Sequence, residues 1–343
     1  MKKVSRKFLN MLAIAVLMMG FTFVAACDDD ENDGGSILEE EYFTIENATY
    51  HSGDMPASTT STTFENITIN DRALSGGLNF ITIVTTTRYK CFYVAVKGIA
   101  GYYSYTPTTN NYSYDGTYYI YTIPLLYSID FEAARHILII SGETEDDEIT
   151  KPYEGTITYV ESQAGDLNIN LTFSNAKDVD LHLYMPDNTH IYYNHRTGYF
   201  YDEDGETVEF GLDHDSNADC RLDYLNNENI FIPEAAVQAG TYKVVVDMYR
   251  NCDRTVATNW SVVARFKGNL LNNTYGQRRN PVSGTYEVNA GNGDMTQVME
   301  FTITESQLRA RTRSVKSSEI KFRPSDEAAI LKYEEAQWNA AHK

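Results

Sequence analysis

Apolar and polar residues alternate with a period of two over much of the sequence from Tyr42 to Thr304. The chain has 343 residues, including 26 Tyr and 15 Phe, and this stretch is also rich in Thr, Val and Ile. Aromatic and β-branched residues favour extended backbone. Short alternating runs separated by turn residues are typical of antiparallel sheets that bury one face of each strand. The pattern therefore predicts an all-β protein.

An acidic segment, Gly142–Glu148, followed by Pro152, divides this region into two parts of ordinary domain size. We expect an N-terminal antiparallel β-sandwich over residues 41–145 and a second over 153–305, both immunoglobulin-like or jelly-roll-like. The first predicted strand of the second part covers residues 155–160. A single larger jelly roll is the alternative.

The composition changes again after residue 305. Residues 306–343 begin with a basic connector that has no apolar pattern. Ser325 then precedes two acidic residues, which is the pattern of a helix N-cap and first turn. We expect a short C-terminal helix that runs to about Trp338.

The amino-terminal residues have the three parts of a secretory signal, which are a basic start, an apolar run from Phe8 to Ala26 and small residues before a cysteine. Val24-Ala25-Ala26-Cys27 resembles the lipobox of bacterial lipoproteins. This resemblance implies that residues 1–26 are removed and that Cys27 is acylated. Several acyl chains on one residue anchor firmly, because each buried methylene contributes about 0.8 kcal/mol. A retained signal-anchor helix is the alternative.

Residues 27–40 begin with the run Asp28-Asp29-Asp30-Glu31-Asn32-Asp33. A segment this polar cannot bury apolar surface, so we expect a disordered tether. Acidic residues beside a lipidated cysteine also resemble the surface-export signal of Bacteroidetes lipoproteins. That resemblance implies a lipid-anchored position at the cell outer membrane, exposed to the outside. A solvated spacer without export function is the alternative.

The formal net charge is −20, and removal of Lys2, Lys3, Arg6 and Lys7 with the leader makes it −24. Like charges repel over a Debye length. The excess of negative charge argues against nucleic acid and anionic membrane surfaces as partners, and it is compatible with cation binding.

Three further cysteines, Cys91, Cys220 and Cys252, follow Cys27. Outside the cytoplasm disulfides persist, but three cysteines allow only one pair. We favour Cys220 with Cys252 because both lie in the second predicted domain. Spacing alone does not establish the pairing.

The segment Asp178–Met185 has the alternation of a strand whose Val179, Leu181 and Leu183 face a core. Asp178, Asp180, His182 and Tyr184 then share the opposite face, which we expect to be exposed. Two carboxylates on one face repel each other unless a cation lies between them. More oxygen donors follow in two later loops, and Ca²⁺ takes about six to eight oxygen ligands. The sequence thus predicts a calcium site formed by Asp178, Asp180, Asp213, Asp215, Asn217 and Glu228.

The alternative is that these residues cap turns and face solvent, as Asp and Asn often do. An EF-hand loop starting at Asp213 does not fit, because Ala218 and Tyr224 occupy the positions of its required Gly and Glu.

Five short motifs occur in order between Leu167 and Tyr249, namely DVDLH, PDNTHIYY, GLDHDSN, ENI and AGTYKVVVDMY. Together they resemble an uncharacterised family of bacterial secreted β-sandwich proteins called YfaP-like. A looser similarity exists to the pre-peptidase C-terminal domain, a calcium-associated jelly roll of secreted proteases. The chain departs from the YfaP-like pattern at Asn188, where Gly is usual, and by an insertion at 199–209.

No catalytic motif is recognisable, since the chain has no G-x-S-x-G elbow, no Walker loop and no G-x-G-x-x-G fingerprint. Four histidines lie close in sequence, but without the H-E-x-x-H spacing of zinc hydrolases; they are His182, His190, His195 and His214. We therefore expect a protein that is not an enzyme. The alternative is a hydrolase that uses carboxylates among Asp178, Asp180, Asp213 and Glu228, because such pairs leave no sequence signature.

Tyrosines gather in the first predicted domain. Exposed together, they could stack against sugar rings or bind a protein; the candidates are Tyr102, Tyr103, Tyr105, Tyr112 and Tyr114. Their strand-forming tendency is a sufficient alternative explanation. The combined prediction is a membrane-anchored surface lipoprotein that serves as a binding or adhesion module for an unidentified protein or glycan. A carbohydrate-binding accessory protein is the alternative.

Overall fold

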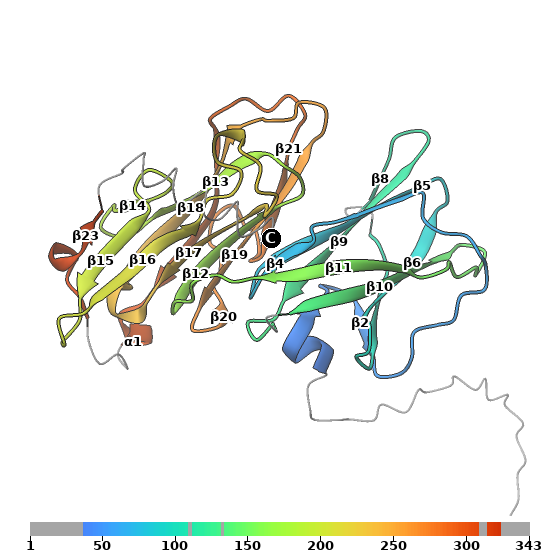
Figure 1. The fold of residues 1–343 in the computed structure, drawn as a ribbon, viewed down its shortest axis with the longest axis horizontal. Coiled ribbons are helices and arrows are strands. Elements are labelled where there is room, and N and C mark those ends of the chain that lie inside the picture. The colour runs from blue at the N-terminus through green and yellow to red at the C-terminus, as the bar shows by residue number, and fades with distance from the viewer. Residues whose placement is uncertain (1–36, 109–111, 132–133, 309–313, 324–343) are drawn as a thin grey trace, which may run out of the picture. The chain divides into compact units, whose positions relative to one another are not determined.

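The computed structural model describes residues 37–108, 112–131, 134–308 and 314–323 (Figure 1). It confirms the all-β fold, because these residues form two β-sandwiches with only short helical turns. The predicted signal peptide, Cys27 and the expected C-terminal helix lie outside the described residues. Within the described ranges, no helix has the length and apolarity needed to cross a membrane.

The first sandwich packs a five-stranded sheet against a six-stranded sheet. The five-stranded sheet has the order β1-β9-β5-β3, with β8 on β9, and its strands are β1 (Phe43–Thr44), β3 (Asn66–Ile69), β5 (Leu78–Thr85), β8 (Tyr112–Tyr114) and β9 (Tyr119–Tyr127). The six-stranded sheet has the order β2-β7-β6-β10-β11-β4, and its strands are β2 (Thr49–His51), β4 (Arg72–Leu74), β6 (Tyr89–Val96), β7 (Tyr102–Tyr105), β10 (Arg135–Thr144) and β11 (Tyr153–Val160). Aromatic rings such as Phe43, Phe92 and Tyr121 fill the core between them.

Strand β11 belongs to the first sandwich, so the assignment of residues 155–160 to the second domain is wrong. It pairs antiparallel with β10 and parallel with β4. The acidic segment is the tip of the β10–β11 hairpin, where Asp147 has a left-handed φ of 62°. A hairpin tip and an interdomain linker need the same polar residues, so composition could not separate them. Every other strand pair in the described ranges is antiparallel, as predicted.

The first sandwich begins within the segment 27–40 that the sequence predicted to be a disordered tether. A single helical turn, Leu38–Tyr42, precedes β1, and Leu38 is completely buried in the first core. A tether that extends to residue 40 is therefore too long. The sequence signal was weak, since only the two apolar residues Ile37 and Leu38 precede Glu39–Glu41. Whether such residues are buried depends on a partner surface that the local sequence does not contain.

The second sandwich packs an eight-stranded sheet against a four-stranded sheet. The larger sheet has the order β20-β19-β12-β17-β16-β15-β23, with β21 on β19, and its strands are β12 (Leu167–Phe173), β15 (Thr197–Tyr201), β16 (Thr207–His214), β17 (Asn227–Ile232), β19 (Thr258–Phe266), β20 (Asn269–Leu270), β21 (Val282–Tyr286) and β23 (Lys321–Phe322). The smaller sheet has the order β14-β13-β18-β22, and its strands are β13 (Asp178–Tyr184), β14 (His190–Ile191), β18 (Gly240–Arg250) and β22 (Asp294–Ile303). Helical turns are Ala218–Cys220, Glu234–Ala236, α1 (Glu305–Leu308) and Ser317–Glu319.

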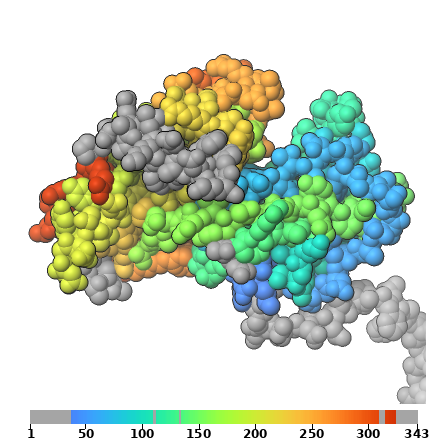
Figure 2. Space-filling view, in the orientation of Figure 1, coloured from blue at the N-terminus to red at the C-terminus, as the bar shows by residue number. Residues whose placement is uncertain are grey.

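Both sandwiches belong to one compact unit. Phe80 of β5 packs against Val263 of β19 in a small buried cluster. A groove of about 910 Å³ lies beside this contact, with Tyr112 on one wall and Thr285 on the other. Figure 2 shows the surface hollowed there, between the β8–β9 hairpin and β21.

The backbone of Gly211 lies close to the backbone of Arg196 on the neighbouring strand segment. Its φ is +129°, and a Cβ atom there would lie 1.8 Å from the carbonyl oxygen of Arg196. We expect Gly211→Ala to lower the free energy of unfolding by about 2–4 kcal/mol, because it adds a clash to an unfavourable φ. The control Gly205→Ala meets nothing within 4 Å and should cost only about 1 kcal/mol of left-handed backbone strain. Urea unfolding measures both, and equal losses would contradict the steric explanation.

Candidate metal centre

Three buried carboxylates converge where the two sheets of the second sandwich meet. Asp180 lies on β13, Glu228 on β17, and Asp215 directly follows β16. One carboxylate oxygen from each lies within 4.8 Å of the others. The three side chains are 2%, 0% and 5% exposed, respectively. The three carboxylates therefore form a buried cluster of oxygen atoms.

Irregular strand pairing occurs at the cluster. The register between β13 and β18 shifts between Asp178 and Asp180, and that between β16 and β17 shifts between Leu212 and His214. An extra residue in one strand bends it and changes the direction of its side chains. The inward orientation of Glu228 does not depend on a register shift. Its side chain lies on the same, core-facing side of β17 as those of Ile230 and Ile232.

Asp178, Asp180 and His182 are buried, so the prediction that they lie on an exposed face is wrong. The loop of residues 215–226 folds over the end of β13. Its Asp219 backbone N–H donates to Asp178 Oδ2 at 2.8 Å, and its Asn217 Nδ2 donates to the Lys177 carbonyl at 2.9 Å. The alternation of β13 is as expected, but the 215–226 loop covers the start of its polar face, and the His190 and Tyr192 rings stack beside His182 further along.

The carboxylates of the cluster differ in their hydrogen bonds. Glu228 accepts from the backbone N–H of Leu181 at 2.7 Å and of Ser216 at 3.3 Å. Asp215 Oδ2 lies 3.4 Å from Arg196 Nη1. Both oxygens of Asp180 are buried, and neither accepts a hydrogen bond from the part of the chain that the structure describes. An unsatisfied buried charge is costly, which makes Asp180 the residue that most needs a further partner.

The electrostatics of the cluster favour a neutralising partner. Burial, together with the nearby carboxylates of Glu228, Asp178 and Asp215, raises the pKa of Asp180 well above its ordinary value. Burial and then Asp215 raise the pKa of Glu228 in the same direction. Burial and then Asp215 also raise the pKa of Asp178, to about 8. Such carboxylates must take up protons or share a cation.

Two of the six predicted ligands are engaged elsewhere. Asp213 accepts from Asn229 Nδ2 at 3.0 Å and from the Gln163 backbone N–H at 2.5 Å, which attaches the segment before β12 to the sheet. Asn217 Oδ1 accepts from the backbone N–H groups of Asp223 and Tyr224. The structure thus brings Asp180, Asp215 and Glu228 together, places Asp178 beside them, and gives Asp213 and Asn217 structural contacts.

Asp247 of β18 was not among the predicted ligands. It pairs with Asp180 across the two strands, and its buried Oδ1 has no hydrogen-bond partner among the described residues. The sequence feature that could have identified Asp247 is its place as an acidic residue within the apolar run Val244–Met248, since an unpaired charge in a buried strand is costly.

The four histidines do not complete a zinc site. His182 Nδ1 lies 2.9 Å from His190 Nε2, whereas His214 Nε2 lies 2.8 Å from the Glu161 carbonyl. Burial and the neighbouring His190 lower the pKa of His182 to about 4, so its ring is neutral at physiological pH. The three converging groups therefore offer oxygen donors alone.

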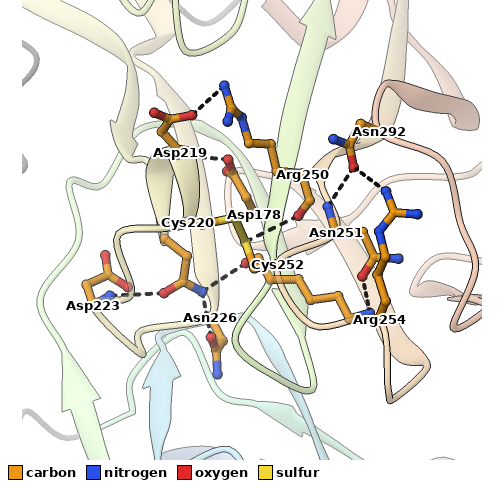
Figure 3. The surroundings of a disulfide bond; sticks show 12 residues. Asp178, Asp219, Cys220, Asp223, Asn226, Arg250, Asn251, Cys252, Arg254 and Asn292 are labelled. Carbon is orange, nitrogen blue, oxygen red and sulfur yellow. Dashed lines mark hydrogen bonds and ion pairs between the residues drawn. A yellow bond between two sulfur atoms is a disulfide. The ribbon is translucent and has the colours of Figure 1, made fainter.

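Cys220 and Cys252, the pair favoured by the sequence, are joined by a disulfide, and Cys91 is a free thiol. The bond connects the 215–226 loop to the chain just after β18 (Figure 3). It therefore lies in the same loop as one cluster carboxylate, Asp215.

The five tyrosines of the predicted platform do not share one surface. Tyr103 and Tyr105 are buried in the first core. Tyr102 projects from the other face of β7 and stacks on His51, with ring centres 4.6 Å apart. Tyr112 and Tyr114 lie on β8 in the other sheet. Because side chains alternate along β7, neighbouring tyrosine rings lie on opposite faces of the strand. A high density of tyrosines in the sequence is therefore not enough to form a platform.

Asn217 organises the loop through four hydrogen bonds of its side chain, two donated and two accepted. Its backbone is also left-handed, with φ 61°. We expect Asn217→Ala to lower the free energy of unfolding by about 2–4 kcal/mol, because it leaves buried polar groups unpaired. Asn188→Ala is the control, since Asn188 is an exposed turn residue with φ 67°. Denaturant unfolding should show the larger loss for Asn217→Ala, and similar losses would contradict its organising role.

No protein-family model and no curated protein matches this chain. Among solved structures, dimeric latent PorU from Porphyromonas gingivalis aligns with 72% of the chain at 9% identity and a TM-score of 0.21. Fervidolysin from Fervidobacterium pennivorans, a keratinolytic enzyme related to subtilisin, aligns with 78% at 10% identity and a TM-score of 0.16. The aligned regions cover 20% of the PorU chain and 34% of the fervidolysin chain. These are distant structural similarities.

Proposed function

We propose that this chain is a lipid-anchored surface protein that acts as a non-catalytic binding or adhesion module, with Ca²⁺ stabilising its second sandwich. The observation that carries the calcium proposal is the pair of unpartnered, buried oxygens of Asp180, which face two further buried carboxylates. Asp178 adds a fourth buried carboxylate beside these three, and among the described residues the guanidinium of Arg196 contacts Asp215. A divalent cation would balance most of the remaining negative charge.

The donor set suits calcium better than zinc or copper. Carboxylate and carbonyl oxygens are the ligands that hard cations prefer, and zinc and copper sites usually include His or Cys. Asp180, Asp215 and Glu228 would hold the ion directly, with Asp178 and Asp247 close enough to add charge. Bound Ca²⁺ would supply a rigid link between strands of the two sheets, which is a structural role.

Burial of the cluster supports a non-catalytic protein. Glycoside hydrolases place their two carboxylates about 5–9.5 Å apart with substrate between them. Here the groups lie within 4.8 Å of one another and are at most 5% exposed, so a sugar has no access to them. The hydrolase alternative therefore gains no support from this site.

The lipid anchor and the surface location rest on the amino-terminal motifs. Val24-Ala25-Ala26-Cys27 has the order of a lipobox, and the acidic run after it has the composition of a surface-export signal. The resemblance of Leu167–Tyr249 to the YfaP-like family is a further part of the proposal. A secreted sandwich on an acyl anchor would meet its protein or glycan ligand outside the cell.

The calcium proposal predicts that thermal stability depends on Ca²⁺. At about 100 times its Kd, a ligand that binds only the folded state stabilises it by about 2.7 kcal/mol. We expect saturating Ca²⁺ to raise the Tm by several degrees relative to chelator. An unchanged Tm would contradict the proposal.

Asp180→Asn makes this test specific. The variant should be more stable than wild type in chelator, because it removes one of several buried like charges, and it should lose the response to Ca²⁺. The variant should therefore have the higher Tm in chelator, and the wild type should have the higher Tm in Ca²⁺. Asp204→Asn, which changes an exposed acidic turn residue, should keep the wild-type response. Scanning calorimetry in chelator and in Ca²⁺ measures all three proteins.

The anchor is tested separately. In cells, Cys27→Ser should leave the chain unacylated, because the thiol that would carry the lipid is absent, and mass spectrometry of the purified variant should find no acyl chain at residue 27. Mass spectrometry of the wild-type amino terminus should find an acylated Cys27, and Cys91→Ser should leave this unchanged. An uncut leader, or a free thiol at Cys27, would contradict the proposal.

A further inference from the structure

The loop that carries Asp215 has an unfavourable backbone. Five of its residues have left-handed φ values between 53° and 63°, and none is glycine; they are Asn217, Asp219, Cys220, Tyr224 and Asn226. Side chains with a Cβ atom rarely adopt this conformation, although Asn and Asp tolerate it best. Such a loop keeps its shape only where contacts around it enforce that shape.

Figure 3 shows two attachments of this loop to the chain at the end of β18. The disulfide joins Cys220 to Cys252, which lies two residues beyond the end of β18. Next to it, Arg250 Nη2 lies 2.7 Å from Asp219 Oδ1. This ion pair is about half exposed on both sides, so solvent weakens it. The disulfide is the covalent attachment of the loop to the smaller sheet.

The cluster depends on this loop at three points. Asp215 is its first residue, Ser216 N–H donates to Glu228 Oε1, and Asp219 N–H donates to Asp178 Oδ2. The last of these donors is the residue directly before Cys220. A loop released from β18 would therefore change the position of one ligand and remove donors that orient two other carboxylates.

We propose that the Cys220–Cys252 disulfide and the cation site are thermodynamically coupled. The disulfide holds the 215–226 loop in the geometry that binds the cation, so reduction weakens binding. Coupling between two sites is reciprocal. Bound cation therefore makes the disulfide harder to reduce by the same factor. This inference rests on the calcium site proposed above and names a means of its regulation.

The redox step is a two-electron reduction that breaks the S–S bond and, with two protons, leaves two thiols. A dithiol reagent supplies the electrons and protons and is itself oxidised to a cyclic disulfide. Neither Cys91 nor the cation changes oxidation state. The coupling is thus a difference in Ca²⁺ affinity between the disulfide and dithiol forms of one folded protein.

The test is calorimetric titration of the mature chain with Ca²⁺ alone. We expect the Cys220→Ser, Cys252→Ser double variant to bind Ca²⁺ about tenfold more weakly than the oxidised wild type, within the usual range of such couplings. Cys91→Ser removes a cysteine outside the loop and should bind as wild type does. Equal affinity of the folded double variant and the wild type would overturn the proposal.

A second measurement needs no variant and stays informative if the double variant does not fold. The wild type is equilibrated with reduced and oxidised dithiol, with Ca²⁺ or with chelator. The ratio of reagents at half reduction should shift by about the same tenfold factor in Ca²⁺. An unchanged ratio in a protein that binds Ca²⁺ overturns the coupling alone, whereas absence of Ca²⁺ binding to the oxidised wild type overturns the proposed function itself.

Discussion

Burial of several carboxylates between two sheets is the constraint on which the second sandwich depends. Asp180, Asp215 and Glu228 are almost inaccessible to solvent, and Asp180 has two oxygens without a hydrogen bond from the described residues. Like charges in such a place are unfavourable without protons or a cation. The register shifts beside the cluster, the left-handed loop and the disulfide are features that arrange these groups despite their repulsion.

The two sandwiches use their interiors differently. Aromatic and aliphatic side chains make up most of the first interior, and their burial is favourable and largely independent of direction, although a few polar groups such as Asn79 and Ser141 are buried there too. The second has an equally apolar centre, but near the 215–226 loop its inward rows end in polar residues, as where Glu228 continues the row of Ile230 and Ile232. Polar groups buried in this way need partners in defined directions, so they specify local geometry more strictly than packing does.

Alternation predicted the strands well, because a half-buried strand must place apolar residues at every second position. The inward face of β13 is as predicted for this reason. The outward face was predicted less well, since alternation says which residues share a face and nothing about what covers that face. The same difficulty applies to β11, whose eight residues suit either sandwich, and to the acidic hairpin tip, which has the composition of a linker.

The amino-acid sequence by itself determined the all-β class, the antiparallel pairing of most strands and the set of acidic residues from which a cation site could be built. These follow from local periodicity and from side-chain chemistry, both of which are properties of short segments. Only the tertiary structure decided that Asp180, Asp215 and Glu228 meet while Asp213 and Asn217 bind elsewhere, and that Asp247 lies opposite Asp180. Convergence depends on register shifts and on one loop folding over a distant strand, and these arise from contacts between segments far apart in the chain.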